Sequence, residues 1–390
     1  MTRLRVGYVT TYPPTPCGVA EYTGDLVRSI KNLGDLSVAV FADGLTDHRA
    51  GFREVVVESA FFPGRSNYTK LLSEIKKYSP LDIIHVQHEY GLFPPSNNFI
   101  KLLESLKKYT NALVITLHTV YHTLKGGELV KHQVSICTVA DAVIVHSPIM
   151  EYELWAQGVS LSKVHLIPHG TRINRSSVKR ETVLERLGVG HLRDKFIFAV
   201  IGFIRKDKGL DVLLKAFKKV ASMRSNVALL IAGTPQGSEG IKHAKEIHKL
   251  ARDLGPATER IAEIGRYLTR RELSELIKAA DVVVLPYRDE PGVLGVSGML
   301  HTVMGCFKPV ICCRTPRLSE CTALVPEASV VPDDPDDLAE KMLYAVDNYK
   351  EFADFFKHLF ELAVRTSWRN VARRHLMLYE KVLHTDAGKD

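Results

Sequence analysis

The sequence has few cysteines and no long apolar run, and both shortages exclude classes of protein. Its six cysteines form no Cys-x-x-Cys pair and show no Cys/His spacing of the kind that binds zinc. No stretch approaches the ~18–20 consecutive apolar residues that a membrane-spanning helix needs. Only a short apolar stretch precedes Pro13 and Pro14, so the N-terminus reads as a first strand and not as a signal peptide. We therefore expect a cytoplasmic chain with reduced thiols.

Low-complexity tracts and solenoid-type repeats are absent as well. With 45% hydrophobic and 25% charged residues, the chain has the composition of a globular protein. Its 390 residues exceed the roughly 250–300 at which single cores stop growing, so we expect two domains. Acidic residues are outnumbered 44 to 52 by Lys and Arg, which gives a net charge of +8. That charge favours a phosphate-bearing partner: nucleic acid, an anionic membrane or a phosphorylated small molecule.

Short β-branched runs alternate with amphipathic stretches along the whole chain. The first series predicts strands over residues 4–10, 36–41, 83–87, 113–117, 142–146 and 164–168. After a charge-rich interval, a second series predicts strands over residues 196–201, 227–232, 260–264, 282–286, 309–313 and 329–331. Apolar runs separated by helices indicate parallel sheets covered on both faces. The sequence thus predicts two doubly wound α/β domains, with a boundary near residue 190 and a ligand site in the cleft at the carboxyl ends of the strands.

The loop between the first strand and the first helix contains Gly18. A glycine there lets the backbone approach a ligand, and the helix behind it offers free N–H groups and a positive dipole end to an anion. The loop lacks the Gly-Lys-Ser/Thr of a P-loop, and a plain strand-to-helix turn explains it equally well.

Four histidines close predicted strands of the first domain: His88, His118, His146 and His169. They should lie along one edge of the first sheet, where a doubly wound fold binds its ligand. Their spacing is not that of a His-Glu-x-x-His helix, so they indicate hydrogen bonding to hydroxyls or phosphate and not zinc binding. The alternative for each is a satisfied structural histidine.

Two cations follow the first strand of the second domain, because Arg205 and Lys208 stand between Gly202 and Gly209 at the start of a helix. A pyrophosphate fits this arrangement, with Arg binding through two N–H groups and Lys acting as a point charge. A solvated cationic turn is the alternative.

A glycine-rich segment over residues 292–298 leads into another predicted helix and forms a backbone nest for an anion. Asp289 and Glu290 stand just before it, where a carboxylate accepts hydrogen bonds from sugar hydroxyls, unless the turn is simply solvated.

These motifs together resemble those of the family 4 glycosyltransferases, which have the GT-B fold. The resemblance covers nearly the whole chain, in the order Cys17-Gly18-Val19-Ala20, Pro168-His169-Gly170, Arg205 with Lys208-Gly209, Ala280 to Pro286, and Lys308-Pro309-Val310-Ile311. The tail from Ser367 to Tyr379 is similar to the terminal helix that crosses back to the first domain in this family. The resemblance implies an acceptor-side domain over residues 1–190, a nucleotide-sugar domain over residues 191–365, and a returning helix over residues 366–390.

The resemblance also implies a role for each matching position. Gly18 would lie near the donor diphosphate and the acceptor, and His118 would contact the transferred sugar. Arg205 and Lys208 would neutralise the departing diphosphate. The remaining contacts would come from backbone amides for the distal phosphate, at Val296, Ser297, Gly298 and Met299, and from Tyr267 and Leu268 beside the nucleotide base.

The chain departs from the family at two positions. The family's paired glutamates, eight positions apart, are replaced by Leu294 and Thr302. Glu290 is the candidate for the sugar contact of the first glutamate. For the ribose contact of the second, Thr302 and Glu320 are weak substitutes.

The resemblance implies a retaining transferase that moves a hexose from a nucleoside-diphosphate sugar to a glycan, lipid or small-molecule hydroxyl. We expect no cofactor and no metal, because fixed cations and helix N-termini can stabilise the diphosphate and no Asp-x-Asp motif lies at a strand end near the phosphate site. The alternatives are a GT-B epimerase or phosphorylase, or a degenerate transferase that only binds.

The remaining positive charge lies on predicted helices, within residues 101–108, 215–219 and 365–374. Such helices suit contact with an anionic membrane, although a solvated face explains them as well. Aromatic residues are not interleaved with the cationic runs, which disfavours nucleic-acid binding.

Overall fold

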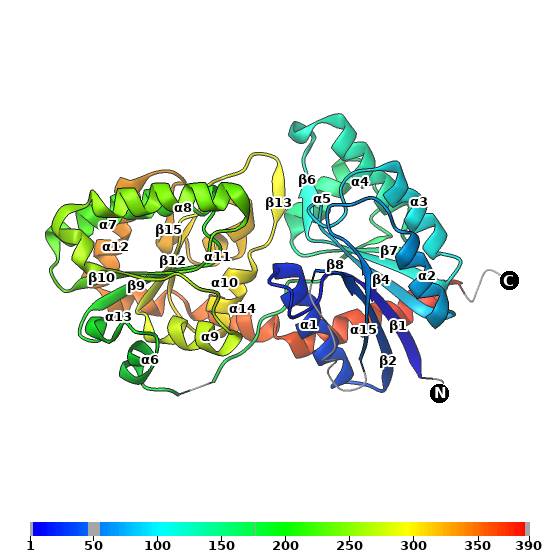
Figure 1. The fold of residues 1–390 in the computed structure, drawn as a ribbon, viewed down its shortest axis with the longest axis horizontal. Coiled ribbons are helices and arrows are strands. Elements are labelled where there is room, and N and C mark those ends of the chain that lie inside the picture. The colour runs from blue at the N-terminus through cyan, green and yellow to red at the C-terminus, as the bar shows by residue number, and fades with distance from the viewer. Residues whose placement is uncertain (1–2, 46–54, 176, 387–390) are drawn as a thin grey trace. The chain divides into compact units, whose positions relative to one another are not determined.

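A computed structural model describes residues 3–45, 55–175 and 177–386 (Figure 1). The chain divides into two compact units. Unit 1 comprises Met1–Gly170, Pro291–Gly298 and Thr366–Asp390, and unit 2 comprises Thr171–Glu290 and Met299–Arg365. Each unit contains a parallel β-sheet with helices on both faces, which confirms the predicted doubly wound α/β class.

The unit 1 sheet has seven strands in the order β3-β2-β1-β4-β5-β7-β8, and all of them are parallel. The strands are β1 (Leu4–Val9), β2 (Leu36–Asp43), β3 (Val56–Phe61), β4 (Leu81–His88), β5 (Thr110–Leu117), β7 (Ala142–Val145) and β8 (Val164–Leu166). All strands expected in this half are present. The sequence analysis missed β3, because only the last two residues of this edge strand are buried and it lacks a continuous apolar run.

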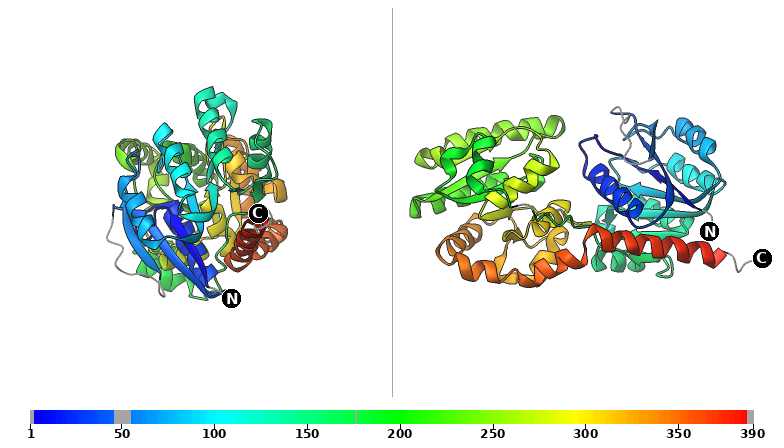
Figure 2. Two further views of the ribbon diagram at one scale, coloured as in Figure 1. Left: turned by 90° about the vertical axis from the view of Figure 1, so that its right-hand side faces the viewer. Right: turned by 90° about the horizontal axis from the view of Figure 1, so that it is seen from below.

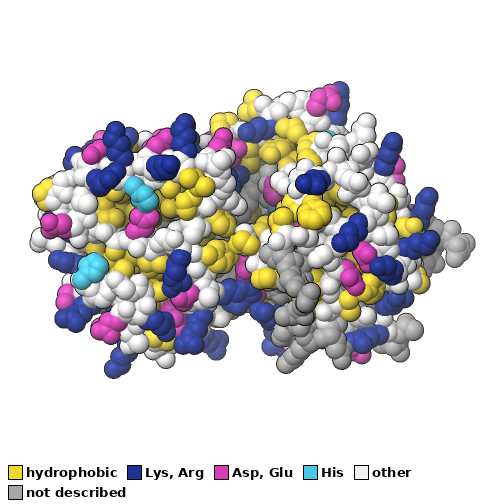
Figure 3. Space-filling model, in the orientation of Figure 1, with side chains coloured by type: hydrophobic (Ala, Val, Ile, Leu, Met, Phe, Trp, Pro, Cys, Tyr) yellow, Lys and Arg dark blue, Asp and Glu magenta, His cyan; other side chains and the backbone are white. Residues whose placement is uncertain are grey.

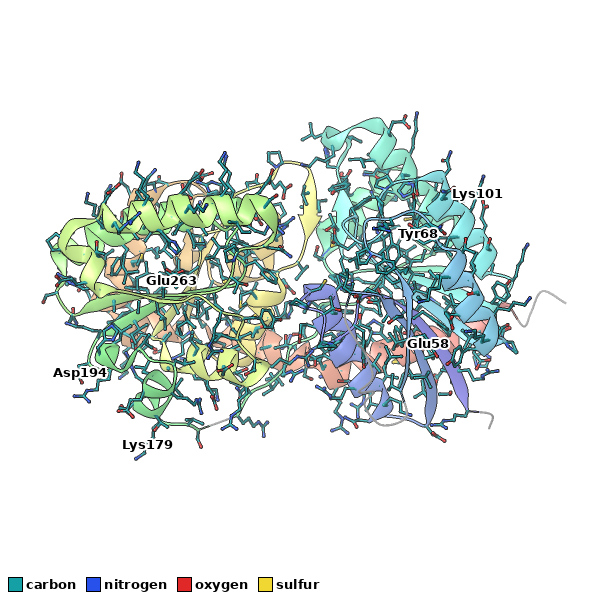
Figure 4. All side chains as sticks on the ribbon, viewed as in Figure 1. Glu58, Tyr68, Lys101, Lys179, Asp194 and Glu263 are labelled. Carbon is teal, nitrogen blue, oxygen red and sulfur yellow. The ribbon has the colours of Figure 1, made fainter. Side chains whose placement is uncertain are left out.

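Helices cover both faces of the unit 1 sheet. One apolar core joins the sheet to α2 (Thr69–Tyr78), α3 (Asn97–Leu106), α4 (Gly127–Val139) and α5 (Pro148–Ala156). The other core joins the opposite face to α1 (Gly18–Lys31) and α15 (Trp368–Asp386), which pack against each other (Figure 2). Figure 4 shows the side chains that fill the first core, with Tyr68 inside it and Lys101 of α3 at the surface. The C-terminal helix is therefore part of the unit 1 core.

A two-stranded antiparallel ribbon completes unit 1. It pairs β6 (Thr119–Tyr121), directly after β5, with β13 (Val293–Gly295). The backbone N–H of His122 also donates to the carbonyl of Gly292 (2.9 Å). A short 3₁₀ turn (η1, Thr123–Lys125) follows β6. The glycine-rich segment thus enters unit 1 by strand pairing.

The unit 2 sheet has six parallel strands in the order β11-β10-β9-β12-β14-β15. The strands are β9 (Phe196–Ile201), β10 (Val227–Ala232), β11 (Ile261–Ile264), β12 (Val282–Leu285), β14 (Val310–Cys313) and β15 (Ser329–Val330). The helices are α6 (Arg180–Arg186), α7 (Leu210–Met223), α8 (Gly237–Arg252), α9 (Arg270–Ala279), α10 (Gly298–Gly305), α11 (Ser319–Leu324), α12 (Pro335–Asp347), α13 (Tyr349–Asp354) and α14 (Lys357–Arg365). Five short 3₁₀ turns lie between them: η2 (Gly190–Leu192), η3 (Lys206–Lys208), η4 (Gly255–Arg260), η5 (Pro316–Leu318) and η6 (Pro326–Ala328).

Unit 2 begins at Thr171, ahead of the boundary expected near residue 190. The charge-rich interval contains α6, whose Val183 and Leu184 are buried in the unit 2 core. Arg180 also donates two hydrogen bonds to the carboxylate of Asp281 (2.8 and 2.9 Å). These contacts fix the charge-rich interval to unit 2.

None of the described helices combines the length and the apolarity needed to cross a membrane.

Candidate functional site

Three of the four strand-end histidines gather around Tyr22, near the start of α1. The ring centroid of Tyr22 lies 4.8 Å from that of His118, 5.2 Å from that of His146 and 5.1 Å from that of His169. Trp368, at the start of α15, packs edge-on against the same ring at 5.0 Å. The carboxyl ends of β5, β7 and β8 and the N-terminus of α1 therefore meet at one cluster, which we call the histidine cluster.

His88 does not join this cluster, contrary to the expectation for strand-end histidines. Its ring is fully buried on the other face of the sheet, against Phe93, Phe99 and Tyr90. The reason is the alternation of side chains along β4, which points His85 to the α1 and α15 face and His88 to the opposite one. His88 is thus a core residue of unit 1 and does not reach a ligand at the histidine cluster.

His118 is the member of the histidine cluster whose charge state is defined by its surroundings. Burial lowers the pKa of His118 well below its ordinary value, and the nearby His146 lowers it further. His146 Nδ1 lies 2.8 Å from the carbonyl oxygen of Ile167 and donates to it. The hydroxyl of Tyr22 is buried and has no hydrogen-bond partner among the described residues, and burial raises its pKa. A neutral ring such as that of His118 favours a hydroxyl as its ligand over phosphate.

Gly18 is the first residue of α1, beside the histidine cluster. The preceding Cys17 has an extended backbone, and its side chain does not cap the first N–H groups of the helix. A Cβ atom built on Gly18 would have no heavy atom within 4 Å. The helix N-terminus therefore faces open space, as the approach of an anion requires.

The glycine-rich segment runs past two of the same histidines. A Cβ on Gly295 would lie 3.1 Å from the carbonyl oxygen of His118, and a Cβ on Gly298 would lie 3.3 Å from His169 Nε2. Val296 and Ser297 connect these two points within unit 1, while Met299 and Thr302 stand at the start of α10 in unit 2. The segment expected to bind the distal phosphate is thus shared between the two units.

In unit 2, three cationic side chains surround the carboxylate of Asp207. It accepts a hydrogen bond from Arg205 Nε (2.8 Å) and lies 3.5 Å from Lys208 Nζ and 3.5 Å from an Arg317 N–H group. Lys208 Nζ also stands 3.7 Å above the ring of Tyr287. Burial alone would raise the pKa of Asp207, but Lys208 and Arg205 outweigh it and lower that pKa. We call Arg205, Lys208 and Arg317 the cation cluster.

The backbone holds the cation cluster at the carboxyl ends of β9 and β12. Arg205 precedes the 3₁₀ turn η3, and the turn ends at Gly209 with φ at +64°. A Cβ on Gly209 would collide with the carbonyl oxygen of Pro286, so only glycine allows this approach. Arg288, next to Tyr287, donates to both oxygens of Asp211 (2.9 and 2.7 Å) and ties the following loop down.

The sequence analysis missed Arg317, although a signal was available. Arg317 lies in η5, which follows the carboxyl end of β14, and the strand-end rule that selected Arg205 and Lys208 applies there equally. Arg317 also pairs with Glu290 at 3.3 Å. It therefore links the predicted sugar-binding carboxylate to the cation cluster.

The two positions proposed for the ribose contact differ in their surroundings. Glu320 accepts a hydrogen bond from His301 Nε2 (2.9 Å), and His301 Nδ1 lies 2.7 Å from the hydroxyl of Thr171. His301 is buried, so it holds the Glu320 carboxylate at the edge of the core. Thr302 lies on the first turn of α10 and is half-buried.

An exposed tyrosine after the edge strand β11 lies beside Phe203, which follows β9 and is half-buried. The side chain of Tyr267 is 50% exposed, and its ring lies 6.3 Å from that of Phe203 at an angle of 34°. Leu268 instead points into the core of unit 2, so it offers its backbone only. Tyr267 and Phe203 thus present a surface on which a planar base can stack.

Within the described ranges, no three His, Cys, Asp or Glu side chains are placed to hold a metal ion together.

Two family models match the chain in succession. A model described as Glycosyltransferase Family 4 matches residues 16–175, and one described as Glycosyl transferases group 1 matches residues 195–348. The first match contains the histidine cluster up to His169, and the second contains the cation cluster.

Two curated relatives match part of the chain. The mannosylfructose-phosphate synthase of Agrobacterium fabrum is 25% identical over 180 residues, which is 44% of this chain and 38% of that protein. A D-inositol 3-phosphate glycosyltransferase of Mycolicibacterium smegmatis is 29% identical over 192 residues, 49% of this chain and 41% of that protein. The chain thus matches less than half of the length of each relative.

A solved structure covers nearly the entire chain. Anabaena HepE, in complex with UDP and glucose, superposes with a TM-score of 0.76 at 17% identity, over 97% of this chain and 100% of that chain. At this identity the likeness shows a shared fold.

Proposed function

Because the chain belongs to the family 4 glycosyltransferases and has their GT-B fold, we propose that it transfers a hexose from a nucleoside-diphosphate sugar to an acceptor hydroxyl with retention of configuration. The observation that carries the proposal is the cation cluster at the carboxyl ends of the unit 2 strands. Three cations around one carboxylate form a ready site for a diphosphate. The retaining course rests on family membership.

In this proposal the cation cluster stabilises the leaving group. As the bond between the sugar and the diphosphate breaks, negative charge grows on the diphosphate, and Arg205, Lys208 and Arg317 neutralise it. Asp207 keeps these side chains close together before the substrate arrives, so little reorganisation is needed. Backbone N–H groups of residues 296–299 hold the distal phosphate. The chain thereby supplies the charge stabilisation without requiring a metal.

Other groups hold the two ends of the donor. The base stacks on Tyr267 and Phe203, and the backbone of Leu268 lies beside it. Glu290 accepts a hydrogen bond from a sugar hydroxyl while Arg317 orients its carboxylate. In unit 1, the neutral His118 and the nearby His169 meet hydroxyls of the sugar and the acceptor, and the open N-terminus of α1 at Gly18 lies beside them.

The names of the relatives direct the choice of substrates for the first assays. HepE is described with UDP and glucose, which makes UDP-glucose the first donor to test. The two curated relatives are named for sugar or polyol phosphates, so hexose phosphates and inositol phosphates are the first acceptors. Glycan and lipid hydroxyls follow.

The test begins with thermal stabilisation by a panel of nucleotide sugars, because a ligand that binds only the folded state raises its stability. Release of nucleoside diphosphate is then measured with the best donor, with and without each acceptor, in the presence and absence of a chelator. We expect release that depends on acceptor and resists the chelator. A changed sugar without release would indicate an epimerase, and dependence on inorganic phosphate a phosphorylase. Stabilisation without any turnover would indicate a binding protein.

We further propose that this is a cytoplasmic protein that contacts the inner, anionic face of the membrane. On unit 1, a hollow between the end of α1 and α15 is lined by two cations and one carboxylate, together with one amide and three apolar side chains: Arg369, Arg373, Glu380, Asn32, Leu33, Leu376 and Met377. Cations beside exposed apolar side chains suit a surface of anionic lipid. On the face drawn in Figure 3, Lys and Arg are interspersed with acidic side chains. Binding to anionic vesicles that Arg369→Glu with Arg373→Glu abolishes would support the contact, and binding equal to that of neutral vesicles would contradict it.

A further inference from the structure

A chain of buried hydrogen bonds crosses unit 1 from the C-terminal helix to His118. Tyr379 of α15 lies with its hydroxyl 2.7 Å from His85 Nδ1 and 2.9 Å from the hydroxyl of Tyr8. On the other side of its ring, His85 Nε2 lies 3.2 Å from the side-chain nitrogen of Gln87. The side-chain oxygen of Gln87 lies 2.9 Å from His118 Nε2. The histidine cluster is thereby joined to α15.

The strand pattern of β4 creates this connection. His85 and Gln87 are two residues apart, so both side chains project from the same face of the sheet. That face is the one covered by α15, whose Tyr379 reaches His85. Tyr8, His85, Gln87 and Tyr379 are completely buried. Buried polar groups without partners cost free energy, so each member depends on the next for its partner.

The placement of the Gln87 oxygen and nitrogen determines the direction of the hydrogen bonds at both histidines. The Gln87 oxygen can only accept, so His118 Nε2 carries the hydrogen and donates. The Gln87 nitrogen donates, so His85 Nε2 offers a lone pair, which the hydroxyl of Thr116 also reaches (2.8 Å). His85 Nδ1 therefore carries the hydrogen and donates to the hydroxyl of Tyr379, which also shares a hydrogen bond with the hydroxyl of Tyr8.

Because His85 and His118 are both neutral, the hydrogen-bond directions decide which ring nitrogen of each histidine carries the hydrogen. Burial lowers the pKa of His85 and of His118 well below the ordinary value. A neutral imidazole has one N–H group and one lone pair, and the partner of one nitrogen decides the state of the other. With Nε2 of His118 committed to Gln87, its Nδ1 is the nitrogen that bears a lone pair.

We propose that α15 positions His118 through Tyr379, His85 and Gln87, and that this chain holds the His118 ring in the Nε2–H tautomer. His118 then recognises a hydroxyl, which donates to its Nδ1, and it does not bind a phosphate oxygen, which cannot donate. The tautomer is inferred from contacts within unit 1 alone. That the hydroxyl belongs to the transferred sugar rests on the proposed function. Gln87, His85 and Tyr379 are positioning residues, because they act through His118.

The tautomer can be measured without any substrate. Ring ¹⁵N spectra of histidine-labelled protein distinguish Nε2–H from Nδ1–H, and His118→Asn identifies the His118 signals by their loss. We expect Nε2–H in the wild type and a mixture of tautomers in Gln87→Leu, with a smaller change in Tyr379→Phe. The matched control is Tyr68→Phe, because the Tyr68 hydroxyl is equally buried in unit 1 but has no hydrogen-bond partner among the described residues (Figure 4).

The outcomes separate this proposal from the proposed function. An Nδ1–H tautomer in the wild type, or an unchanged Nε2–H signal in a folded Gln87→Leu variant, would overturn it even if the enzyme transfers sugar. If no donor and acceptor pair gives turnover while the tautomers behave as expected, the proposed function fails and the positioning chain stands. Where Gln87→Leu does not fold, Gln87→Glu replaces it: its carboxylate still accepts from His118, but it loses the donor to His85, so only the His85 signals should change.

Turnover supplies a second measurement once substrates are known. Gln87→Leu should lower kcat by about tenfold in the wild-type background, because a displaced contact weakens orientation of the reacting groups. In a His118→Asn background the same substitution should have little further effect, since residues that act through one another are not additive. Equal losses in both backgrounds would show a structural role independent of His118.

Discussion

Replacement of Lys208 with methionine tests the proposed diphosphate site most directly. The ammonium group lies 3.5 Å from Asp207 and 3.7 Å from the Tyr287 ring centroid, and methionine keeps an apolar stem against that ring while it removes the charge. Two unit charges 4 Å apart interact by about 4 kcal/mol near a protein surface. Loss of one preorganised group typically costs about 3–4 kcal/mol of transition-state stabilisation. We therefore expect kcat to fall by about 10²–10³-fold.

The assay is release of nucleoside diphosphate at saturating donor and acceptor. Lys206→Met is the matched control, because Lys206 carries the same charge in the same 3₁₀ turn but is exposed to solvent. It should alter kcat by about twofold or less, as screening weakens exposed charges. Near-normal turnover in Lys208→Met, or an equal loss in Lys206→Met, would refute the assignment. A rise in KM alone would mean that Lys208 binds substrate and transition state equally.

Three further predictions follow from the same structure. Gly18→Leu should leave the melting temperature unchanged, because its Cβ enters open space, yet abolish stabilisation by the donor; a variant that is still stabilised would exclude Gly18 from the site. Gly209→Ala should lower the free energy of unfolding by more than about 1 kcal/mol, since φ is +64° and Pro286 is in the way, and an unchanged denaturation midpoint would contradict this. Burial lowers the pKa of His375 from 6.5 to about 4, so below pH 6.5 the unfolded chain binds a proton that the folded chain excludes. Stability should therefore fall as the pH decreases from about 6.5 towards 4, and an unaltered slope in His375→Leu would count against this cause.

The features that the sequence predicted well depend on local rules. Apolar runs on both faces predicted the central strands of both sheets, because such strands are buried whatever their neighbours are. The ends of parallel strands meet at one edge, and this rule brought His118, His146 and His169 together. Side chains alternate between the two faces of a strand, and this alternation can be read from the sequence of β4. It would also have separated His88 from the other three histidines.

The features that the sequence could not predict depend on contacts between distant segments. The pairing of β13 with β6 joins segments far apart in the chain and leaves no local pattern. The contact between Tyr379 and His85 likewise spans most of the chain, so neither residue signals it. The charge-rich interval suggested a domain boundary near residue 190, but it contains a helix whose Arg180 is bonded to Asp281 of unit 2. In each of these examples, contacts with segments distant in the sequence determine the structure.

The missing glutamates have a structural explanation that favours an active transferase over a degenerate one. Leu294 occupies the first position, and it is buried in the unit 1 core as part of β13, opposite Val120 of β6. A carboxylate there would be buried without a partner at considerable cost, so strand pairing with unit 1 and a glutamate at this position exclude each other. Glu290 precedes the strand and is oriented by Arg317, which in turn contacts the carboxylate that organises Arg205 and Lys208. We therefore propose that the sugar-binding carboxylate is displaced to Glu290, beside the cation cluster.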